Sequence, residues 1–391
     1  MKRQNSINNS WVRLILVVLL IGTLGFGANG CMIKRPILIG FAAQLTGIQA
    51  ELGVQERNGA QMAVEKINAT GGVAGRKIEL ITSDDHGIPE KAQAADRELI
   101  KAGVFAIIGH ATSAQTQAGL EVTNPAKVVL LGPTVSTPEL SGLDDYFFRV
   151  YPSFKDGAQA FTQYIYQRSG ITQLAVIYDS DNAAFAKTYC STVASKFQSL
   201  GGTIISETSF SSAAQSDFSP LLLKLRASKA EGLLIIASDI DTALIAQRTR
   251  LMGWQTPLFT SSWAQTETLI NNGGQVVEGI KFAQSCALNS QSSTFLEFQT
   301  RYQTRFGHAP SFGAAYGYDS FLILAAALEK TGGRPEGLKQ ALLETHDFQG
   351  LMNTFSFDRF GDVEQPTYLN TIRNGKFITL EKLTLAEPGG E

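Results

Sequence analysis

The 391-residue chain carries little charge, and neither sign of charge predominates. Charged residues make up 17% of the sequence, and the formal net charge is −2. Nucleic-acid-binding domains usually carry a basic patch, so this balance argues against DNA or RNA as a partner. A hydrophobic content of 44% is typical of an ordered globular protein, and the length suggests two domains.

The sequence also lacks the short motifs of common enzymes. It has no G-x-S-x-G nucleophile motif and no Walker motif. Its four histidines are scattered. A base–nucleophile pair of His110 with Ser113 is an alternative, but we expect a binding protein rather than an enzyme. Asp84, Asp85 and His86 are adjacent without a second ligand cluster, so we expect a solvated loop, and neither a metal nor another cofactor.

The chain has no apolar run of the length that usually spans a membrane. Near the N-terminus, Lys2, Arg3 and Arg13 precede a short apolar run, Leu14–Leu24, which small residues follow. This order of segments predicts a secretory signal peptide over residues 1–30. The alternative is a transmembrane anchor, which needs roughly 20 apolar residues.

Cysteine is rare, and the first of the three stands directly after the predicted signal peptide. The sequence before Cys31 resembles a bacterial lipobox, although Ala28 stands where leucine is preferred. Acylation would make Cys31 the mature N-terminus, and a lipidated tether over residues 31–36 would hold the protein at a membrane. We therefore expect a lipoprotein in the periplasm or on the outer cell surface. Export would permit a disulfide, but we expect Cys190 and Cys286 to be buried thiols.

Short apolar runs alternate with helical patterns in the first third of the chain. In one of these patterns, Ala60, Val64 and Ile67 recur at helical spacing. Continuous apolar strands separated by helices predict a parallel sheet covered on both faces. The strands are expected at 37–41, 78–82, 104–108 and 128–131, and the helices at 58–68, 91–101 and 115–122.

A second series of the same kind predicts a second lobe of similar build. Its strands are expected at 174–178, 203–205, 232–236 and 257–260, and its helices at 185–200, 218–227 and 241–252. The C-terminal third adds helices near 293–306, 314–330 and 335–344 and strand-like pieces at 353–357 and 369–377. These pieces are too few for a third domain. No repeat of 20–50 residues occurs, which argues against a solenoid.

Loops rich in small hydroxyl residues follow several predicted strands, where open α/β sheets bind their ligands. Ser113 stands just before a helix, and the start of a helix presents unpaired N–H groups and partial positive charge to an anion. We therefore expect a carboxylate there, with a simple N-cap role as the alternative. Thr134, Val135 and Ser136 form the corresponding loop after the next strand.

Two acidic residues, Asp239 and Asp241, follow a strand of the second series. Asp241 precedes Thr-Ala-Leu and fits a helix N-cap. Asp239 has no evident capping role. An ammonium group is costly to bury without a counter-charge, so we expect Asp239 to pair with the ammonium group of a ligand.

Several short stretches together resemble the Leu/Ile/Val-binding protein family, the extracellular receptors of branched-chain-amino-acid ABC transporters. The resemblance covers nearly all of residues 36–383, and the order and spacing of the stretches make it specific. The stretches are Ile39-Gly40, Leu45-Thr46-Gly47, Asn58-Gly59-Ala60, Ile67 to Gly72, Asp84-Asp85, Ile108-Gly109-His110, Pro133 to Leu140, Leu200-Gly201-Gly202, Asp217-Phe218, Val277-Glu278-Gly279 and Tyr316-Gly317-Tyr318-Asp319.

The resemblance implies a type I periplasmic-binding fold, with two Rossmann-like α/β lobes of parallel sheets and a hinge that the chain crosses three times. A family ligand is held by its α-carboxylate at positions that match Ser113 and the Thr134/Ser136 loop, and its ammonium is met in the second lobe. The implied parts are 37–150 with 285–354 as lobe 1, 151–284 with 355–383 as lobe 2, 384–391 as a tail, and crossings near 149–152, 282–285 and 355–357.

The chain departs from the family at several of these positions. In the family, an acidic residue pairs with the ammonium. The matching position in this chain falls near Ser262 and Trp263, and neither of these residues is acidic. The aromatic expected in the second lobe is Ala184 or Phe185, and Leu52 stands where an aromatic often covers the site. Trp263 and Phe185 favour a larger or aromatic ligand over valine.

The resemblance implies that a monomer captures a small amino-acid-like ligand by hinge closure and presents it to the membrane permease of an ABC transporter. One alternative is a ligand-sensing receptor subunit of a signalling system, and another is an adhesive or structural lipoprotein. For the ligand, the alternative to branched-chain amino acids is an aromatic acid or an amide.

Overall fold

The computed structural model describes residues 35–214, 217–286 and 292–385. The predicted signal peptide and the predicted lipidation site Cys31 therefore lie outside the described residues. The chain divides into two compact units, Met1–Arg35 and Pro36–Glu391, and the second unit contains the α/β lobes.

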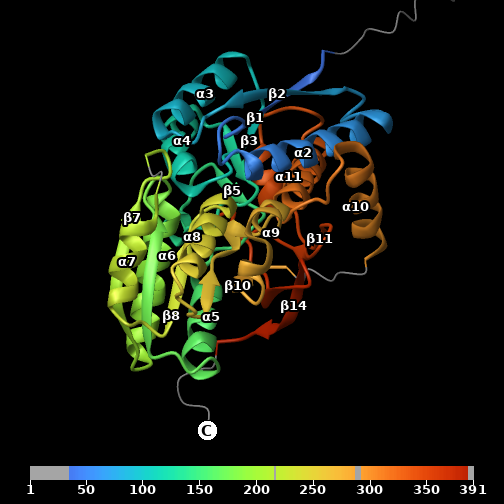
Figure 1. Cartoon of the computed structure of the whole chain (residues 1–391). Helices are drawn as coiled ribbons and strands as arrows, with labels where there is room; N and C mark the ends of the chain where they lie inside the picture. Colours follow the sequence, from blue (N-terminus) through green and yellow to red (C-terminus); the bar gives the residue numbers. More distant parts are fainter. Residues whose placement is uncertain (1–34, 215–216, 287–291, 386–391) are drawn as a thin grey trace, which may run out of the picture. The chain divides into compact units, whose positions relative to one another are not determined.

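A five-stranded parallel sheet forms the first lobe, with the strand order β2-β1-β3-β4-β5 (Figure 1). Every residue of β3 and β4 is buried, as expected for strands with helices on both faces. The strands are β1 (Ile37–Ala43), β2 (Ile78–Asp84), β3 (Ala106–Gly109), β4 (Val129–Gly132) and β5 (Phe147–Arg149).

Helices from both ends of the chain belong to this lobe, because α11 packs closely against α2 (Figure 1). Two glycines allow the close approach: a Cβ atom on Gly59 would lie 1.9 Å from the Ala314 carbonyl oxygen, and one on Gly317 would lie 2.3 Å from that of Glu56. The helices are α2 (Glu51–Ala69), α3 (Pro89–Lys101), α4 (Ser113–Ala126), α10 (Ser293–Phe306), α11 (Phe312–Lys330) and α12 (Leu338–Leu343).

A seven-stranded sheet forms the second lobe, with the order β14-β13-β10-β9-β8-β6-β7. Five of its strands are parallel, and β13 and β14 extend it as an antiparallel hairpin. The strands are β6 (Gln173–Asp179), β7 (Thr203–Phe210), β8 (Gly232–Ile236), β9 (Leu258–Thr260), β10 (Lys281–Gln284), β13 (Thr367–Arg373) and β14 (Lys376–Leu383). The helices are α5 (Lys155–Gln167), α6 (Ala183–Ser199), α7 (Ser219–Ala227), α8 (Asp239–Leu251) and α9 (Glu267–Gly273).

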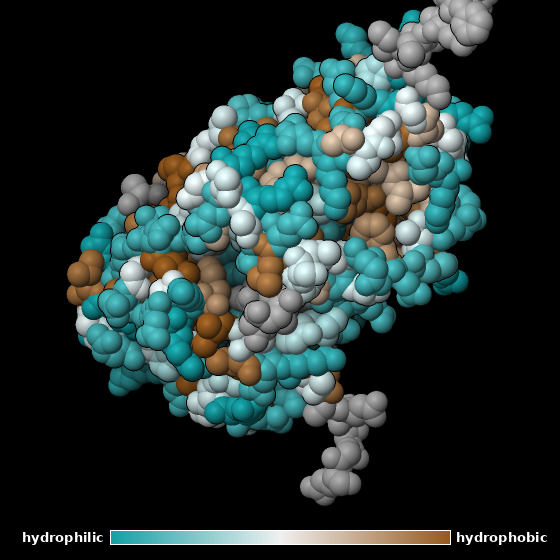
Figure 2. All heavy atoms as spheres, turned by 90° about the vertical axis from the view of Figure 1, so that its right-hand side faces the viewer, coloured by the Kyte–Doolittle hydropathy of each residue, from teal (hydrophilic) through white to brown (hydrophobic). Residues whose placement is uncertain are grey.

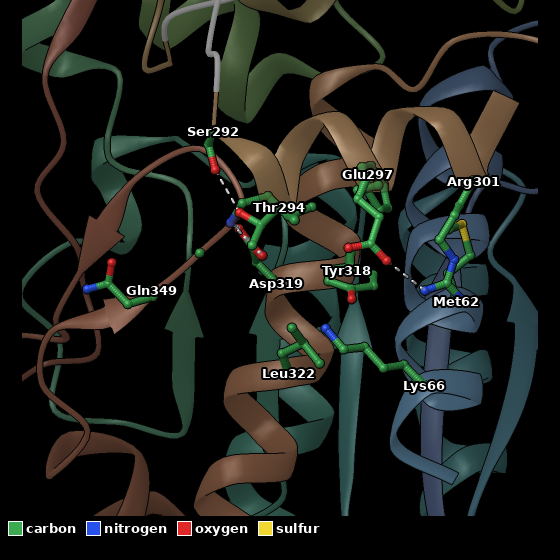
Figure 3. Close-up of a pocket in the computed structure, with 13 residues that line it drawn as sticks. Met62, Lys66, Ser292, Thr294, Glu297, Arg301, Tyr318, Asp319, Leu322 and Gln349 are labelled. Carbon is green, nitrogen blue, oxygen red and sulfur yellow. Dashed lines mark hydrogen bonds and ion pairs between the residues drawn. The ribbon is translucent and has the colours of Figure 1, made fainter. Parts of the chain in front are cut away.

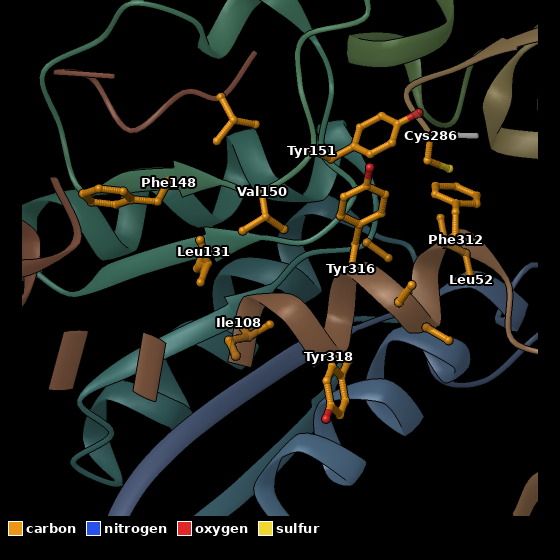
Figure 4. Packing of buried hydrophobic residues seen from close by; sticks show 14 of the residues in the cluster. Leu52, Ile108, Leu131, Phe148, Val150, Tyr151, Cys286, Phe312, Tyr316 and Tyr318 are labelled. Atoms are coloured by element: carbon orange, nitrogen blue, oxygen red, sulfur yellow. The ribbon is translucent and has the colours of Figure 1, made fainter. Parts of the chain in front are cut away.

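The chain passes between the two lobes three times. It leaves the first sheet after β5, returns between β10 and α10, and leaves again after the short strands β11 (Phe348–Gln349) and β12 (Thr354–Phe355). Aromatic rings pack beside the first crossing: the Tyr151 ring meets Tyr316 edge-on at 5.1 Å and Phe312 at 5.8 Å between centroids (Figure 4). The expected fold, two α/β lobes joined by a three-crossing hinge, is confirmed.

Two local predictions differ from the structure. Residues 369–377 are not one strand-like piece, because a turn at Asn374 and Gly375 divides them between β13 and β14. Both turn residues have positive φ, +54° and +65°, as the tight turn of a two-residue hairpin requires. The loop of Asp84 and Asp85 is not fully solvated, because Asp85 is buried. Cys190 and Cys286 are free and buried, as expected.

Within the described ranges, no helix is both long and apolar enough to cross a membrane. The face shown in Figure 2 is mainly hydrophilic, and its hydrophobic residues form small separate groups. Large exposed hydrophobic side chains such as Ile48, Leu223 and Leu251 are far apart in the sequence. Single exposed apolar residues of this kind are normal on a protein surface.

Candidate functional site

A small cavity lies between the two lobes, next to the loops that follow strands of both sheets. Its volume is about 20 Å³, which is room for about one water molecule, so the lobes must separate before it can admit a ligand. We call it the interlobe cavity. The first lobe lines it with Leu52, Ala111, Thr112, Ser113, Thr134, Ser136 and Phe312. The second lobe lines it with Asn182, Phe185, Ser262 and Trp263.

Most of the residues singled out in the sequence lie around this cavity. Six of the eight residues predicted to bind a ligand line it, namely Leu52, Ser113, Thr134, Ser136, Phe185 and Trp263. Asn182 and Phe312 also line it, and sequence reasoning missed both. Asn182 directly precedes the helix that carries Phe185, so the position of that helix start was the signal that could have found it.

Val135 and Asp239 do not line the interlobe cavity, contrary to their predicted roles. Val135 is fully buried and packs in the core of the first lobe with Leu130 and Phe147, because the side chains of its two neighbours face the cavity and its own faces inward. Its side chain therefore cannot contact a ligand in the cavity.

Asp239 is held by its own lobe. It is the first residue of α8, and one carboxylate oxygen accepts a hydrogen bond from the Ile240 N–H at 2.8 Å while the other accepts one from the Thr266 hydroxyl. Burial raises its pKa above the ordinary value. The N-cap of α8 is Ser238, whose hydroxyl accepts from the Asp241 N–H, and not Asp241 as predicted.

Several side chains that line the cavity belong to buried residues and carry polar atoms without a partner in the described part of the chain, although these atoms are not fully enclosed. The hydroxyls of Ser113 and Ser136, the amide NH₂ of Asn182 and the indole N–H of Trp263 make no hydrogen bond with any residue that the structure describes. Helix α4 begins here. Its N-cap residue Thr112 makes no side-chain cap, and the Ala114 N–H of the first turn bonds to Asn182 of the second lobe. These donors are free of partners among the described residues at the cavity, so they are available to an acceptor such as a carboxylate.

The side chains that line the cavity carry no charge. Thr134 leads to a buried carboxyl group behind the cavity: its hydroxyl oxygen lies 2.5 Å from Glu56 Oε1 and 2.9 Å from the Ala111 carbonyl oxygen. The Thr134 hydroxyl has one proton, which it donates to the Ala111 carbonyl oxygen. The short contact with Glu56 is then a hydrogen bond that Thr134 accepts from the protonated carboxylic acid of Glu56. Burial raises the pKa of Glu56 to about 8, which agrees with a neutral carboxylic acid.

His110 is part of a buried ion-pair cluster rather than a catalytic pair. Its Nδ1 lies 2.6 Å from Asp85 Oδ2 and its Nε2 lies 3.2 Å from Asp96 Oδ2, with all three side chains buried. Burial alone would lower the pKa of His110, but Asp96 and Asp85 raise it to about 10. Both ring nitrogens are therefore protonated donors, and neither is free to act as a base toward Ser113. Among the described residues, no group of three or more His, Cys, Asp or Glu side chains could hold a metal ion.

A glutamine joins the lobes near the cavity. Gln49 lies before α2, and its Nε2 donates to Asp241 Oδ2 at 2.7 Å and lies 3.3 Å from both Asp179 Oδ2 and Ser238 Oγ in the second lobe. The Ser212 hydroxyl lies between the two carboxylates, 2.5 Å from Asp241 and 2.8 Å from Asp179. We call these contacts the Gln49 latch.

Two further hydrogen bonds link the lobes. The Ala114 N–H in the first turn of α4 donates to Asn182 Oδ1 at 3.2 Å. The Thr188 hydroxyl of α6 donates to Glu139 Oε1 at 2.9 Å. The structure is therefore a state in which the lobes are in contact around the interlobe cavity.

A different cavity lies within the first lobe, among α2, α10 and α11 (Figure 3). Lys66, Glu297 and Arg301 point toward it, and the buried Asp319 accepts the Leu351 N–H at its inner end. Burial raises the pKa of Asp319 to about 8. This cavity involves one lobe only and is lined by none of the residues predicted to bind a ligand.

The two hinged α/β lobes and the cavity between them define a bilobal ligand-binding protein. A family model described as periplasmic binding protein matches residues 36–376, so the chain belongs to that family. The chain is similar to an amino acid binding protein of Pseudomonas aeruginosa, with 26% identity over 85% of this chain and 89% of that protein. It is also 24% identical to Leu/Ile/Val-binding protein homolog 3 of Brucella melitensis, over 95% of this chain and 100% of that protein.

Solved structures have the same fold. A leucine-binding protein from Thermotoga maritima superposes with a TM-score of 0.82 at 24% identity, covering 89% of this chain and 98% of that one. A solute-binding protein of an ABC transporter from Rhodopseudomonas palustris, in complex with 3,4-dihydroxybenzoic acid, superposes with a TM-score of 0.79 at 23% identity, covering 90% and 99%.

Proposed function

We propose that this protein captures a small organic carboxylate between its lobes and presents it to the membrane permease of an ABC transporter. The observation that carries the proposal is the interlobe cavity with its unpaired donors. Ser113 and the first turn of α4 receive the carboxylate from the first lobe, and Asn182 and Trp263 close over it from the second. The names of the relatives, which include amino acid and Leu/Ile/Val-binding proteins, support this class of ligand.

Capture proceeds by closure of the hinge. The lobes separate to admit the ligand, and contacts from both sides favour the closed state once the ligand is present. The protein acts as an exported monomer, and the acylated Cys31 holds it at the membrane surface near its permease. A sensing role with a signalling partner would use the same closure, so the two roles differ only in the protein that recognises the closed form.

A second candidate ligand is an aromatic acid in place of an amino acid. The cavity has the rings of Phe185, Trp263 and Phe312 in its wall and no charged side chain. The ammonium of an amino acid would be buried there without a counter-charge, which costs several kcal/mol unless polar groups compensate. Asp239 does not compensate, because it is hydrogen-bonded elsewhere. The relative from Rhodopseudomonas palustris that holds 3,4-dihydroxybenzoic acid supports this candidate.

Substitution of Ser113 tests the proposal. Ser113→Asp places a negative charge at the start of α4 and is expected to weaken carboxylate binding at least a hundredfold, because two anions would share a buried site. Ser195→Asp, on the exposed outer face of α6, is the matched control and should leave affinity unchanged. Calorimetric titration with branched-chain amino acids and with benzoate measures both. Equal affinity of Ser113→Asp and the wild type would refute carboxylate binding at this position.

A further inference from the structure

A second cavity, also of about 20 Å³, lies on the hinge side of the interlobe cavity. Tyr151, Tyr189, Gln284 and Ser285 line it, and Ser262 lines both cavities. We call it the hinge cavity. Residues of the first crossing, of α6 and of the end of β10 therefore meet at the floor of the candidate site.

One aromatic ring packs between residues that line the two cavities. Phe185 lines the interlobe cavity, and its ring packs at 5.8 Å from Trp263 on that side. On the other side it packs at 5.3 Å from Phe154 and at 5.6 Å from Tyr189, both of which line the hinge cavity. A shift of this ring would join the cavities into one longer site.

The Tyr189 hydroxyl is a fully buried polar group at the hinge cavity that lacks a partner within the described ranges. Its side chain is 2% exposed, and its hydroxyl makes no hydrogen bond to any described residue. The neighbouring Tyr151 hydroxyl donates to Gln284, which is also bonded to Gln265 and to the Ser285 N–H. Burial of an unpaired hydroxyl is costly, so a group that bonds to Tyr189 would bind with a gain in free energy.

The residues that line the hinge cavity also determine which chemical group of a ligand can bind there. Its polar members are hydroxyls and an amide, and no charged side chain lines it. A second carboxylate or an ammonium would lose its hydration there without a counter-charge. A neutral hydroxyl meets no such cost, and it can donate to or accept from Tyr189.

We propose that Tyr189 forms a second subsite, which binds a hydroxyl group at the end of the ligand that lies away from the carboxylate. The preferred ligand is then a hydroxylated aromatic monocarboxylate that displaces the Phe185 ring and reaches both cavities. This inference rests on the proposed capture function and deepens it by naming the substrate class.

The test compares matched ligand pairs on the wild type and on Tyr189→Phe, which removes only the hydroxyl. The pairs are benzoate with 4-hydroxybenzoate, phenylacetate with 4-hydroxyphenylacetate, and 3-phenylpropionate with 3-(4-hydroxyphenyl)propionate, each titrated by calorimetry. The wild type should bind the hydroxylated member of at least one pair about five- to tenfold more tightly. In Tyr189→Phe that ratio should fall to about one, with affinity for the parent acid unchanged.

Tyr302→Phe is the matched control, because it removes another buried hydroxyl, which lines neither cavity and has Asn58 as its partner. It should keep the wild-type ratio. Thermal unfolding checks the fold: Tyr189→Phe should have an unchanged or higher Tm, since it removes an unpaired buried group, whereas Tyr302→Phe should have a lower one.

The outcomes separate this inference from the function on which it rests. A hydroxyl preference that persists in Tyr189→Phe, or the absence of any preference in all three pairs, would overturn the Tyr189 subsite and leave carboxylate capture intact. Binding of branched-chain amino acids without any of the six aromatic acids would overturn the substrate class. Binding of none of these compounds would contradict the proposed function itself.

Discussion

At the residue scale, the candidate site depends on ionisable groups that lie behind it rather than in it. Glu56 supports Thr134 from behind the cavity wall, and His110 is locked between Asp85 and Asp96. These groups hold the loops after β3 and β4 in place while leaving the cavity lining neutral. A neutral lining with unpaired donors suits one negative charge brought in by a ligand.

The protonated state of Glu56 leads to a prediction about stability and pH. Its pKa is about 8 in the folded protein and has the ordinary value of 4.5 when unfolded, so between these pH values the folded state holds a proton that the unfolded state lacks. Its contribution to stability is present below pH 4.5 and is lost as pH rises toward 8. Glu56→Gln keeps a donor for Thr134 and removes the titration.

Chemical denaturation at pH 5, 6, 7 and 8 measures this effect. The free energy of unfolding of the wild type should fall relative to that of Glu56→Gln by up to about 1.4 kcal/mol per pH unit. Glu98→Gln, which removes an exposed carboxylate of α3, controls for the change in net charge. Parallel curves for the wild type and Glu56→Gln would mean that Glu56 is ionised in the folded state.

At the element scale, the loop between β1 and α2 links the lobes through the Gln49 latch. The neutral amide of Gln49 donates hydrogen bonds to two acidic side chains of the second lobe. These are Asp179 at the end of β6 and Asp241 at the start of α8. Removal of this amide takes away a contact that exists only when the lobes are together. The latch should therefore favour the closed state even before a ligand binds.

Gln49→Ala is expected to shift the ligand-free protein toward an open arrangement. Its radius of gyration from small-angle X-ray scattering should exceed that of the wild type, and ligand affinity should fall about tenfold, since a hydrogen bond to a charged group is lost. Gln61→Ala is the control, because the Gln61 amide bonds to Glu65 within α2. The latch has no role in closure if both variants scatter like the wild type.

The sequence predicts those elements whose pattern follows local rules. Apolar runs and helical spacing locate the strands of both sheets, as for residues 232–236, which form β8. The hairpin of β13 and β14 was missed although Asn374-Gly375 is a strong turn signal. The roles of Val135 and Asp239 could not be read from the sequence, because they depend on the direction of a side chain in a loop and on Thr266, which lies 27 residues away. The Gln49 latch depends likewise on residues about 130 and 190 positions away.

At the scale of the whole molecule, one large hydrophobic cluster runs through both lobes, from Ile39 in the first sheet to Leu234 in the second, and the cavity between the lobes takes its donors from both. The hinge crossings place Tyr151 and its aromatic neighbours beneath that cavity, so relative motion of the lobes changes the environment of the site directly (Figure 4). Trp263 is a natural reporter of this region, because it lines the cavity while Trp254 packs in the core of the second lobe. The third tryptophan, Trp11, lies in the predicted signal peptide.

The most direct measurement is a fluorescence titration of the Trp254→Phe protein, produced without residues 1–30, in which Trp263 is the remaining tryptophan. Branched-chain amino acids and aromatic monocarboxylates are added in turn, and binding is measured in parallel by calorimetry. Capture between the lobes predicts a saturable change in Trp263 emission with the same Kd as the calorimetric titration. A compound that binds by calorimetry and leaves Trp263 emission unchanged would contradict a site between the lobes.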